Sequence, residues 1–179
     1  MLDNDEVTKL YHYTLKKLPQ GNIEDSQAPG SPSFYQDKEV ASLQKKFMPI
    51  IEKSIQTQLL AVFCYNRIYR KGALLRAHQD SSRAQISASI NLGQQGEPWG
   101  LWVLDYNETP HEVILQPGDA LIYYGQKLMH WRETLVKADL VSQVMFHFVP
   151  KTTMNTLITY NELFRKIRKR CRQMMGIAY

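Results

Sequence analysis

The chain has 179 residues, of which 44% are hydrophobic and 22% are charged, a composition ordinary for one globular domain with a real core. No apolar run approaches the roughly 20 residues that a membrane-spanning helix needs, and the polar, acidic N-terminus does not have the pattern of a signal peptide. Cys64 and Cys171 lie far apart and neither has a CxxC partner, so we expect a reducing, cytoplasmic setting and no disulfide scaffold.

The net charge of +5 is a property of the C-terminal tail. Six basic residues lie within Arg165–Arg172, and without them the rest of the chain is close to neutral. Residues 158–175 have a helical pattern, with Leu163, Ile167 and Met174 on one face and the basic residues on the other. Such a helix either docks by its apolar face and leaves its charges in water, or binds an anionic partner such as nucleic acid or a membrane surface.

The first third of the chain predicts a loop and a helix. Residues 20–36 are rich in Gly, Pro, Ser and Asn, which is typical of a loop. Apolar residues then recur at helical spacing, at Val40, Leu43, Phe47, Ile51 and Ile55. Pro49 interrupts this pattern, so we expect a kink or a break of the helix near Met48.

The middle of the chain predicts many short strands and no helix. The strands are expected at 59–70, 84–93, 99–106, 111–116, 120–125 and 140–149, with a turn at Pro117-Gly118-Asp119. This order is typical of an all-β sandwich or barrel. We therefore expect one domain spanning 1–179, mainly β, with a β core at about 59–150 and with N-terminal and C-terminal helices packed outside it.

The predicted strand 84–93 has one apolar and one polar face. Its apolar face carries Ile86, Ala88, Ile90 and Leu92, and its polar face carries Ser87, Ser89 and Asn91. In a barrel the polar face lines an internal cavity, whereas in an open sheet it faces solvent.

A candidate metal site begins at His78-Gln79-Asp80. Side chains alternate along an extended chain, so a His-x-Asp pair places an imidazole and a carboxylate on the same side. A second histidine from a distant strand, His130, would complete a set of three ligands and leave the opposite side of the ion open. This 2-His-1-carboxylate arrangement suits Fe(II) that must also bind a co-substrate and O₂. His147, between Phe146 and Phe148, is expected in the core or behind the ligands.

The surrounding residues resemble the prolyl 4-hydroxylase-like branch of the Fe(II)- and 2-oxoglutarate-dependent oxygenases, including a bacterial and phage-type subgroup. The resemblance covers roughly 35–150 and rests on Tyr69, Gly72, Leu75, His78 and Asp80, then on Pro117-Gly118-Asp119, and finally on His130-Trp131-Arg132-Glu133. It implies a double-stranded β-helix, or jelly roll. It also implies Fe(II), 2-oxoglutarate and O₂, with 2-oxoglutarate decarboxylated to succinate while a hydrogen atom is removed from the substrate.

The sequence departs from that pattern at one position. The branch normally has Lys or Arg ten residues after the distal histidine, where it pairs with the far carboxylate of 2-oxoglutarate, but this chain has Leu140. A buried carboxylate without a cation is costly. We expect Arg132 and Tyr69 to take over, with Gln143 as a hydrogen-bonding residue. Lys137 and Arg83 are other candidates, and the alternative role for Arg132 is a salt bridge with Glu133.

Three functions remain open at this point. The first is an Fe(II)- and 2-oxoglutarate-dependent dioxygenase that hydroxylates a protein side chain or a small molecule. The second is a nucleic-acid-modifying oxygenase that holds its substrate with the basic C-terminal helix. The third is a non-catalytic jelly-roll binding module that has kept the ligands. A cupin-like metal enzyme that does not use 2-oxoglutarate is a fourth alternative.

Overall fold

Two helices and nine strands make up most of residues 4–152, the part of the chain that this computed structural model describes. Their order is α1 (Asn4–Lys17), a short 3₁₀ helix η1 (Leu18–Gln20), β1 (Ser33–Tyr35), α2 (Lys38–Ile55), β2 (Leu59–Arg70), β3 (Leu75–His78), β4 (Ile86–Gly96), β5 (Leu101–Leu104), β6 (Pro110–Val113), β7 (Ala120–Tyr123), β8 (His130–Arg132) and β9 (Ala138–Pro150). The expected basic helix at 158–175 lies outside the described residues. No described helix is long and apolar enough to cross a membrane.

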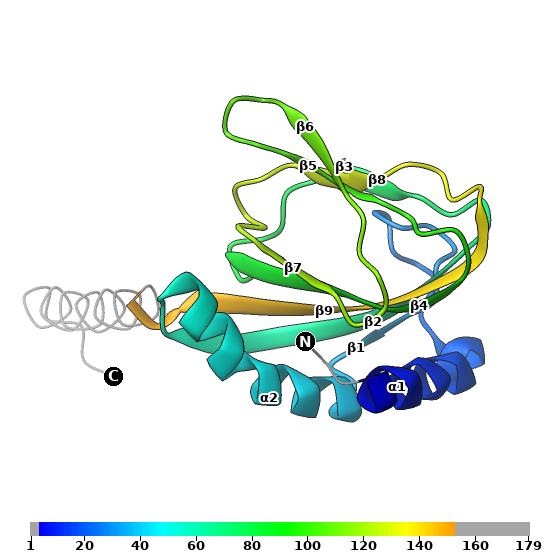
Figure 1. Ribbon diagram of the computed structural model, residues 1–179, viewed down its shortest axis with the longest axis horizontal. Helices are drawn as coiled ribbons and strands as arrows, with labels where there is room; N and C mark the ends of the chain where they lie inside the picture. The colour runs from blue at the N-terminus through cyan, green and yellow to red at the C-terminus, as the bar shows by residue number, and fades with distance from the viewer. Residues whose placement is uncertain (1–3, 153–179) are drawn as a thin grey trace, which may run out of the picture.

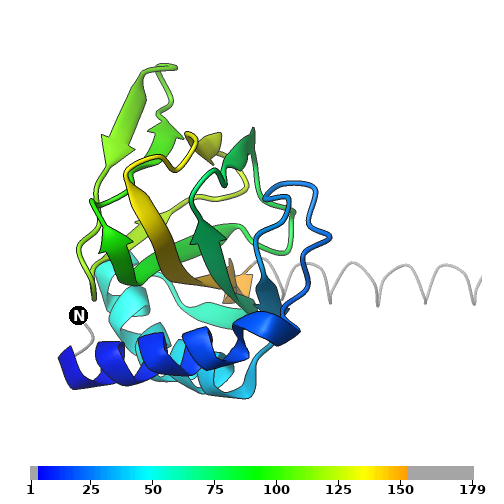
Figure 2. The same cartoon turned by 90° about the vertical axis from the view of Figure 1, so that its right-hand side faces the viewer.

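The strands form two antiparallel sheets that face each other. The large sheet has the order β1-β2-β9-β4-β7, and the small sheet has the order β3-β8-β5-β6. Figure 1 shows the small sheet above the large one, and Figure 2 shows the same layers from the side. From β2 onward the chain crosses repeatedly between the sheets, with only β5 and β6 following each other in the same sheet. This produces a jelly roll of the double-stranded β-helix type and confirms the mainly β prediction.

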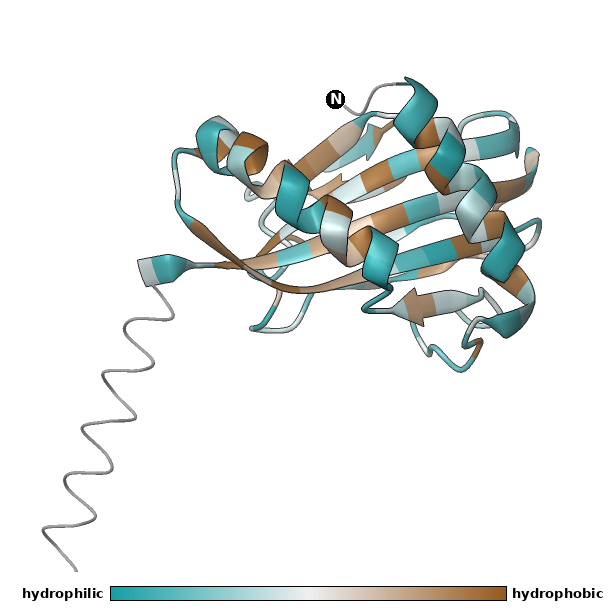
Figure 3. Ribbon diagram, turned by 90° about the horizontal axis from the view of Figure 1, so that it is seen from below, coloured by the Kyte–Doolittle hydropathy of each residue, from teal (hydrophilic) through white to brown (hydrophobic). Residues whose placement is uncertain are grey.

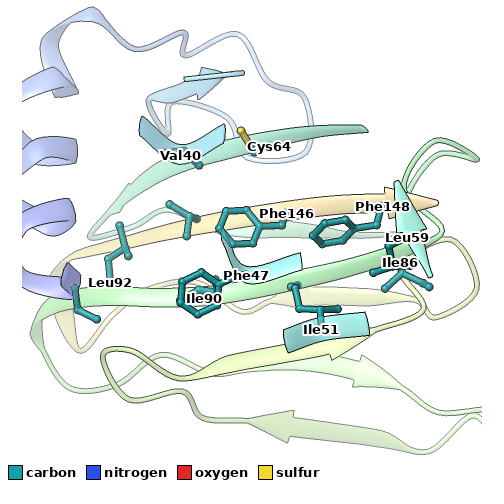
Figure 4. Close-up of a cluster of buried hydrophobic side chains, with 13 residues drawn as sticks. Val40, Phe47, Ile51, Leu59, Cys64, Ile86, Ile90, Leu92, Phe146 and Phe148 are labelled. Carbon is teal, nitrogen blue, oxygen red and sulfur yellow. The ribbon is translucent and has the colours of Figure 1, made fainter. Parts of the chain in front are cut away.

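The main hydrophobic core lies on the outer face of the large sheet, under the helices. Both α1 and α2 cross this face and turn their polar sides to solvent (Figure 3). The core joins residues of α2 to residues of three strands; its members include Val40, Phe47, Ile51, Leu59, Cys64, Ile90, Phe146 and Phe148 (Figure 4). A second, smaller hydrophobic cluster joins the two sheets and includes Tyr69, Leu75 and Leu101. Beside it, polar residues face the space between the sheets.

Helix α2 begins at a strong cap and runs past its proline. The side chain of Asp37 accepts hydrogen bonds from the backbone N–H groups of Glu39 and Val40, which satisfies donors that a helix start leaves free. The expected break near Met48 is wrong, because the helix continues through Pro49 to Ile55. Pro49 is exposed, and the buried residues on both sides of it, Phe47 and Ile51, fix the two halves on the sheet.

The two faces of β4 point to two different layers. Ile86, Ala88, Ile90 and Leu92 belong to the core beneath the helices. Ser87, Ser89 and Asn91 alternate with them and are also buried, so this polar face does not lie in solvent. Since β4 lies between β9 and β7 in the large sheet, its polar face looks into the barrel.

Residues 20–36 are more ordered than a plain loop. They include the strand β1, which pairs with β2, and an isolated bridge joins Asn22 to Ser33. The backbone N–H of Ile68 donates to the carbonyl of Pro32, and that of Arg76 donates to the carbonyl of Gln27. These bonds hold the segment against β2 and β3, where it forms a wall of the barrel.

The core between helices and sheet predicts a large loss of stability on truncation of Phe146, whose side chain is fully buried. Phe146→Ala should lower the free energy of unfolding by about 3–5 kcal/mol, because it leaves a cavity that the packed layer cannot close. The control Tyr106→Ala removes a ring that is 70% exposed and should change stability by less than about 0.5 kcal/mol. Urea denaturation measures both, and equal stability of the two variants would contradict this view of the core.

Candidate metal centre

His78, Asp80 and His130 come together in the wall of one cavity. His78 ends β3, Asp80 follows in the next loop, and His130 begins β8, which pairs with β3. One ligand atom from each residue lies within 4.8 Å of the others. The Nε2 atoms of His78 and His130 are 3.7 and 3.8 Å from the same oxygen, Oδ1 of Asp80. Ligand atoms that share one first-row ion at about 2.0–2.2 Å are slightly closer than this, so a small inward movement suffices.

Backbone carbonyls set the orientation of both imidazoles. Nδ1 of His78 lies 2.8 Å from the carbonyl oxygen of Arg76, and Nδ1 of His130 lies 3.0 Å from that of Leu128. Each Nδ1 therefore carries the proton and donates it, and each Nε2 presents a free lone pair to the centre. Burial lowers the pKa of His130, which favours the neutral ring that can bind a metal.

The two oxygens of the Asp80 carboxylate make different contacts. Oδ1 faces the histidines, and Oδ2 accepts a 2.6 Å hydrogen bond from the hydroxyl of Ser87. The backbone of Gly125 presses against this arrangement, since a Cβ on Gly125 would lie 2.0 Å from Oδ2 of Asp80. The carbonyl of Gly125 also accepts the backbone N–H of Asp80. The carboxylate is thus held from two sides.

His147 lies behind the ligands. Its Nδ1 is 3.0 Å from Oγ of Ser87 and 3.9 Å from Oδ2 of Asp80. Burial lowers its pKa to about 4, so the ring is neutral at pH 7. It does not belong to the ligand cluster. The expected position in the core or behind the ligands is confirmed by this contact through Ser87.

A cavity of about 200 Å³ extends from the ligands into the barrel. Its walls come from β2, β4, β8 and β9 and from the segment around Asp25 and Gln27. All six residues that the sequence suggested for metal and co-substrate, namely Tyr69, His78, Asp80, His130, Arg132 and Gln143, line this one cavity. Leu140 does not line it, although it occupies the position where a cation was expected.

Arg132 is a buried cation with no acidic partner among residues 4–152. It is only 2% exposed. Its guanidinium donates to the carbonyl of Trp99 and, at 2.9 Å, to Oε1 of Gln143, and it stacks over the Trp99 ring. The alternative salt bridge with Glu133 is wrong, because Glu133 instead accepts from the indole of Trp131. Burial lowers the pKa of Arg132 to about 10.

Two tyrosines face Arg132 across the cavity. Tyr69 is 1% exposed and packs edge-on against Trp99, with the ring centroids 4.9 Å apart. Tyr123 packs edge-on against His130, and burial raises its pKa well above the usual range. The hydroxyl of Tyr123 therefore stays protonated at neutral pH and is available as a hydrogen-bond donor.

The other candidate cations have different surroundings. Lys137 is exposed and pairs with Glu97 at 3.0 Å. Arg83 is exposed as well, and its guanidinium lies over the ring of Phe63. Neither belongs to the cavity wall.

Sequence reasoning missed several residues of this site. Arg67 lines the cavity and forms an ion pair with Asp25. It lies two positions before Tyr69 on the same face of β2, so the period-two pattern of a strand was enough to find it. Asp25 and Gly125 gave no such signal, because only the folded chain brings them to the site.

The fold is similar to those of solved oxygenases. The chain matches a prolyl 4-hydroxylase from Pseudomonas putida with 16% identity and a TM-score of 0.61, over 83% of this chain and 88% of that one. It matches HygX from Streptomyces hygroscopicus, solved with nickel, 2-oxoglutarate and hygromycin B, with 12% identity and a TM-score of 0.63, over 81% of this chain and 78% of that one. The viral collagen prolyl hydroxylase of Paramecium bursaria Chlorella virus-1, solved with 2-oxoglutarate, gives 13% identity and a TM-score of 0.58, over 82% and 91%.

These likenesses are structural. No protein-family model matches the sequence, and no curated protein is similar to it in sequence. The chain therefore has the fold of the Fe(II)- and 2-oxoglutarate-dependent oxygenases, and it carries a His-x-Asp…His cluster in its cavity.

The contact of Gly125 with Asp80 predicts a selective defect in metal binding. Gly125→Ala should weaken Co(II) binding by about 10- to 100-fold, the range for residues that support a metal ligand, because the new methyl group displaces the carboxylate. Visible absorption of bound Co(II) measures the affinity. The neighbouring control Tyr124→Ala, which removes a side chain that is 49% exposed, should bind Co(II) like the wild type. Unchanged affinity in Gly125→Ala would refute the argument.

Proposed function

We propose that this protein is an Fe(II)- and 2-oxoglutarate-dependent dioxygenase that hydroxylates a protein side chain or a small molecule. The observation that supports this most strongly is the pairing of two features in one cavity. A cluster of two histidines and one carboxylate lies beside a buried arginine that has no acidic partner in the described part of the chain. The first feature suits a divalent metal, and the second suits a dicarboxylate.

His78, Asp80 and His130 would hold the iron. Two neutral imidazoles and one carboxylate on one side of an ion leave its other positions open, as an Fe(II) oxygenase needs. The two carbonyls that accept from the Nδ1 atoms, those of Arg76 and Leu128, keep both Nε2 lone pairs directed to the ion. When bound, iron with 2-oxoglutarate supplies oxidative decarboxylation and the means to oxidise a substrate C–H bond.

Arg132, Tyr69 and Gln143 would hold the far carboxylate of 2-oxoglutarate. A guanidinium removed from water without a counter-ion is costly, and a carboxylate from the co-substrate offsets that cost. Gln143 already accepts from Arg132 through its Oε1, so it orients the guanidinium, and its amide N–H₂ can donate to a ligand. Tyr69 lines the same cavity and brings a hydroxyl that can donate to the carboxylate.

The rest of the cavity positions the reactants and limits water. Buried side chains of Leu75 and Leu101 line it together with the polar residues. A cavity of about 200 Å³ is below the 300–1,000 Å³ or so that engulfs a drug-sized ligand. With the co-substrate in place, only a group about the size of one side chain can enter. The remainder of the substrate must lie outside.

The iron site predicts a spectroscopic signal. Anaerobic addition of Fe(II) and 2-oxoglutarate should produce a weak visible charge-transfer band, because chelation by the co-substrate places its carbonyl group on the metal. The band should be absent in His78→Ala and present in His111→Ala, which removes an exposed histidine paired with Asp105. Absence of the band with wild-type protein would rule out the proposal.

The assignment of Arg132 predicts a selective loss of 2-oxoglutarate affinity. Arg132→Met should raise the dissociation constant for 2-oxoglutarate by at least about 30-fold, since it removes the cation from a buried charge pair. Titration calorimetry on Zn(II)-loaded protein measures this, and Zn(II) binding itself should be little changed.

Two matched variants sharpen that experiment. Lys137→Met removes an exposed cation outside the cavity and should leave the 2-oxoglutarate affinity at its wild-type value. Arg67→Met removes the other buried guanidinium of the cavity, which already has Asp25 as its partner. A larger loss of 2-oxoglutarate affinity in Arg67→Met than in Arg132→Met would show that the far carboxylate pairs with Arg67 and not with Arg132.

A further inference from the structure

The hydrogen bonds around Asp80 determine where the proton of His147 lies. The hydroxyl of Ser87 donates its single proton to Oδ2 of Asp80, at 2.6 Å. At its 3.0 Å contact with Nδ1 of His147, the oxygen of Ser87 must then be the acceptor. Nδ1 therefore carries the proton. Because a neutral imidazole has only one N–H, Nε2 of His147 is a bare acceptor.

This acceptor is left without a partner. His147 is 6% exposed and lines the same cavity as the candidate ligands. No group in residues 4–152 forms a hydrogen bond with its Nε2, whereas its Nδ1 is bound to Ser87. Nε2 is not among the sealed, unpaired side-chain atoms of the described residues, so it is accessible from the cavity that His147 lines. A ligand that displaces water from this acceptor must bring a donor of its own, because an acceptor that loses its partner on burial is costly.

The walls next to His147 are aromatic and flat. The ring of Phe63 lies 4.4 Å from that of His147, with 34° between the planes, and Tyr65 meets His147 edge-on at 6.2 Å. Both rings line the cavity. Tyr35 continues this surface outward, with its centroid 5.8 Å from Phe63, and it is 54% exposed. The aromatic surface Tyr35-Phe63-Tyr65 thus leads from solvent to His147.

We propose that His147 is the residue that orients the substrate, by accepting a hydrogen bond at Nε2 from an N–H or O–H group on a flat, uncharged part of the substrate. The flat group packs against Phe63 and Tyr65, and the rest of the molecule extends over Tyr35. This deepens the proposed function, on which it rests for the reaction. The hydrogen bond accepted by Nε2 of His147 depends on residues of the chain alone, so it can be tested without iron or 2-oxoglutarate.

The position of the proton is tested first, on full-length wild-type protein. Two-bond ¹⁵N–¹H correlation spectra of histidine-labelled protein at pH 7 should show His147 as the neutral Nδ1–H form. Ser87→Ala, which removes the hydroxyl that accepts from Nδ1, should release this preference. An Nε2–H form in the wild-type protein would overturn the proposal, and this measurement needs no His147 variant to fold.

The acceptor is tested with two small probes. 2-Pyridone is flat and carries one N–H donor, and 1-methyl-2-pyridone has the same ring without the donor. 2-Pyridone should shift the Nε2 resonance of His147 and bind about five- to tenfold more tightly than its methylated form, the ratio expected for one hydrogen bond. Equal affinities, or no shift at Nε2, would overturn the proposal.

Two variants assign the effect to His147. His147→Phe keeps a flat ring against Phe63 but has no acceptor, so it should bind both probes equally. Met145→Leu changes another residue of the same cavity wall on β9 and should keep the preference for 2-pyridone. If the charge-transfer band is absent but the probe preference is present, the proposed reaction fails while the binding site stands; the reverse result removes the site and leaves the reaction.

Discussion

The two-faced large sheet is the constraint on which this structure depends. Each strand of that sheet has one face under the helices and one face inside the barrel, and side chains alternate between them. On β4 the aliphatic residues take the outer face and Ser87, Ser89 and Asn91 take the inner face. The larger hydrophobic cluster therefore lies outside the barrel and the smaller one joins the two sheets. The inner face of the large sheet can then carry polar residues in a cavity that also holds two arginines, two carboxylates and three histidines.

The charges inside the barrel are held by different means. Arg67 has Asp25 as an ion partner, whereas Arg132 has only a carbonyl, an amide oxygen and an aromatic face. The carboxylate of Asp80 is fixed by Ser87 and by the close backbone of Gly125. These neutral supports satisfy hydrogen bonds but do not balance the charge of the Arg132 guanidinium, so that charge is left to be balanced by what binds there.

The sequence was informative wherever a local pattern decided the structure. Alternation identified β4, and β-branched and aromatic composition identified β2. The spacing of His78, Asp80 and His130 predicted a cluster that the fold brings together. Patterns that depend on tertiary contacts were not readable. Pro49 did not break α2, because packing of the flanking residues outweighed the lost hydrogen bond, and the loop that includes Asp25 became a cavity wall through backbone bonds to distant strands. The ligands' own supports, Ser87 and Gly125, were likewise visible only in three dimensions.

The short strand β8 carries both His130 and Arg132. Residues two apart on one strand point to the same side and are separated by about 6.6 Å of extended backbone. In the proposed site, His130 thus anchors one end of the co-substrate through the metal, and Arg132, on the same strand, anchors the other end through its guanidinium. The separation is then a property of covalent geometry, and no shift in the pairing of neighbouring strands can change it. In the proposed site this fixed separation would select the length of the dicarboxylate. A diacid one carbon longer or shorter would have to bend or leave one end unbound.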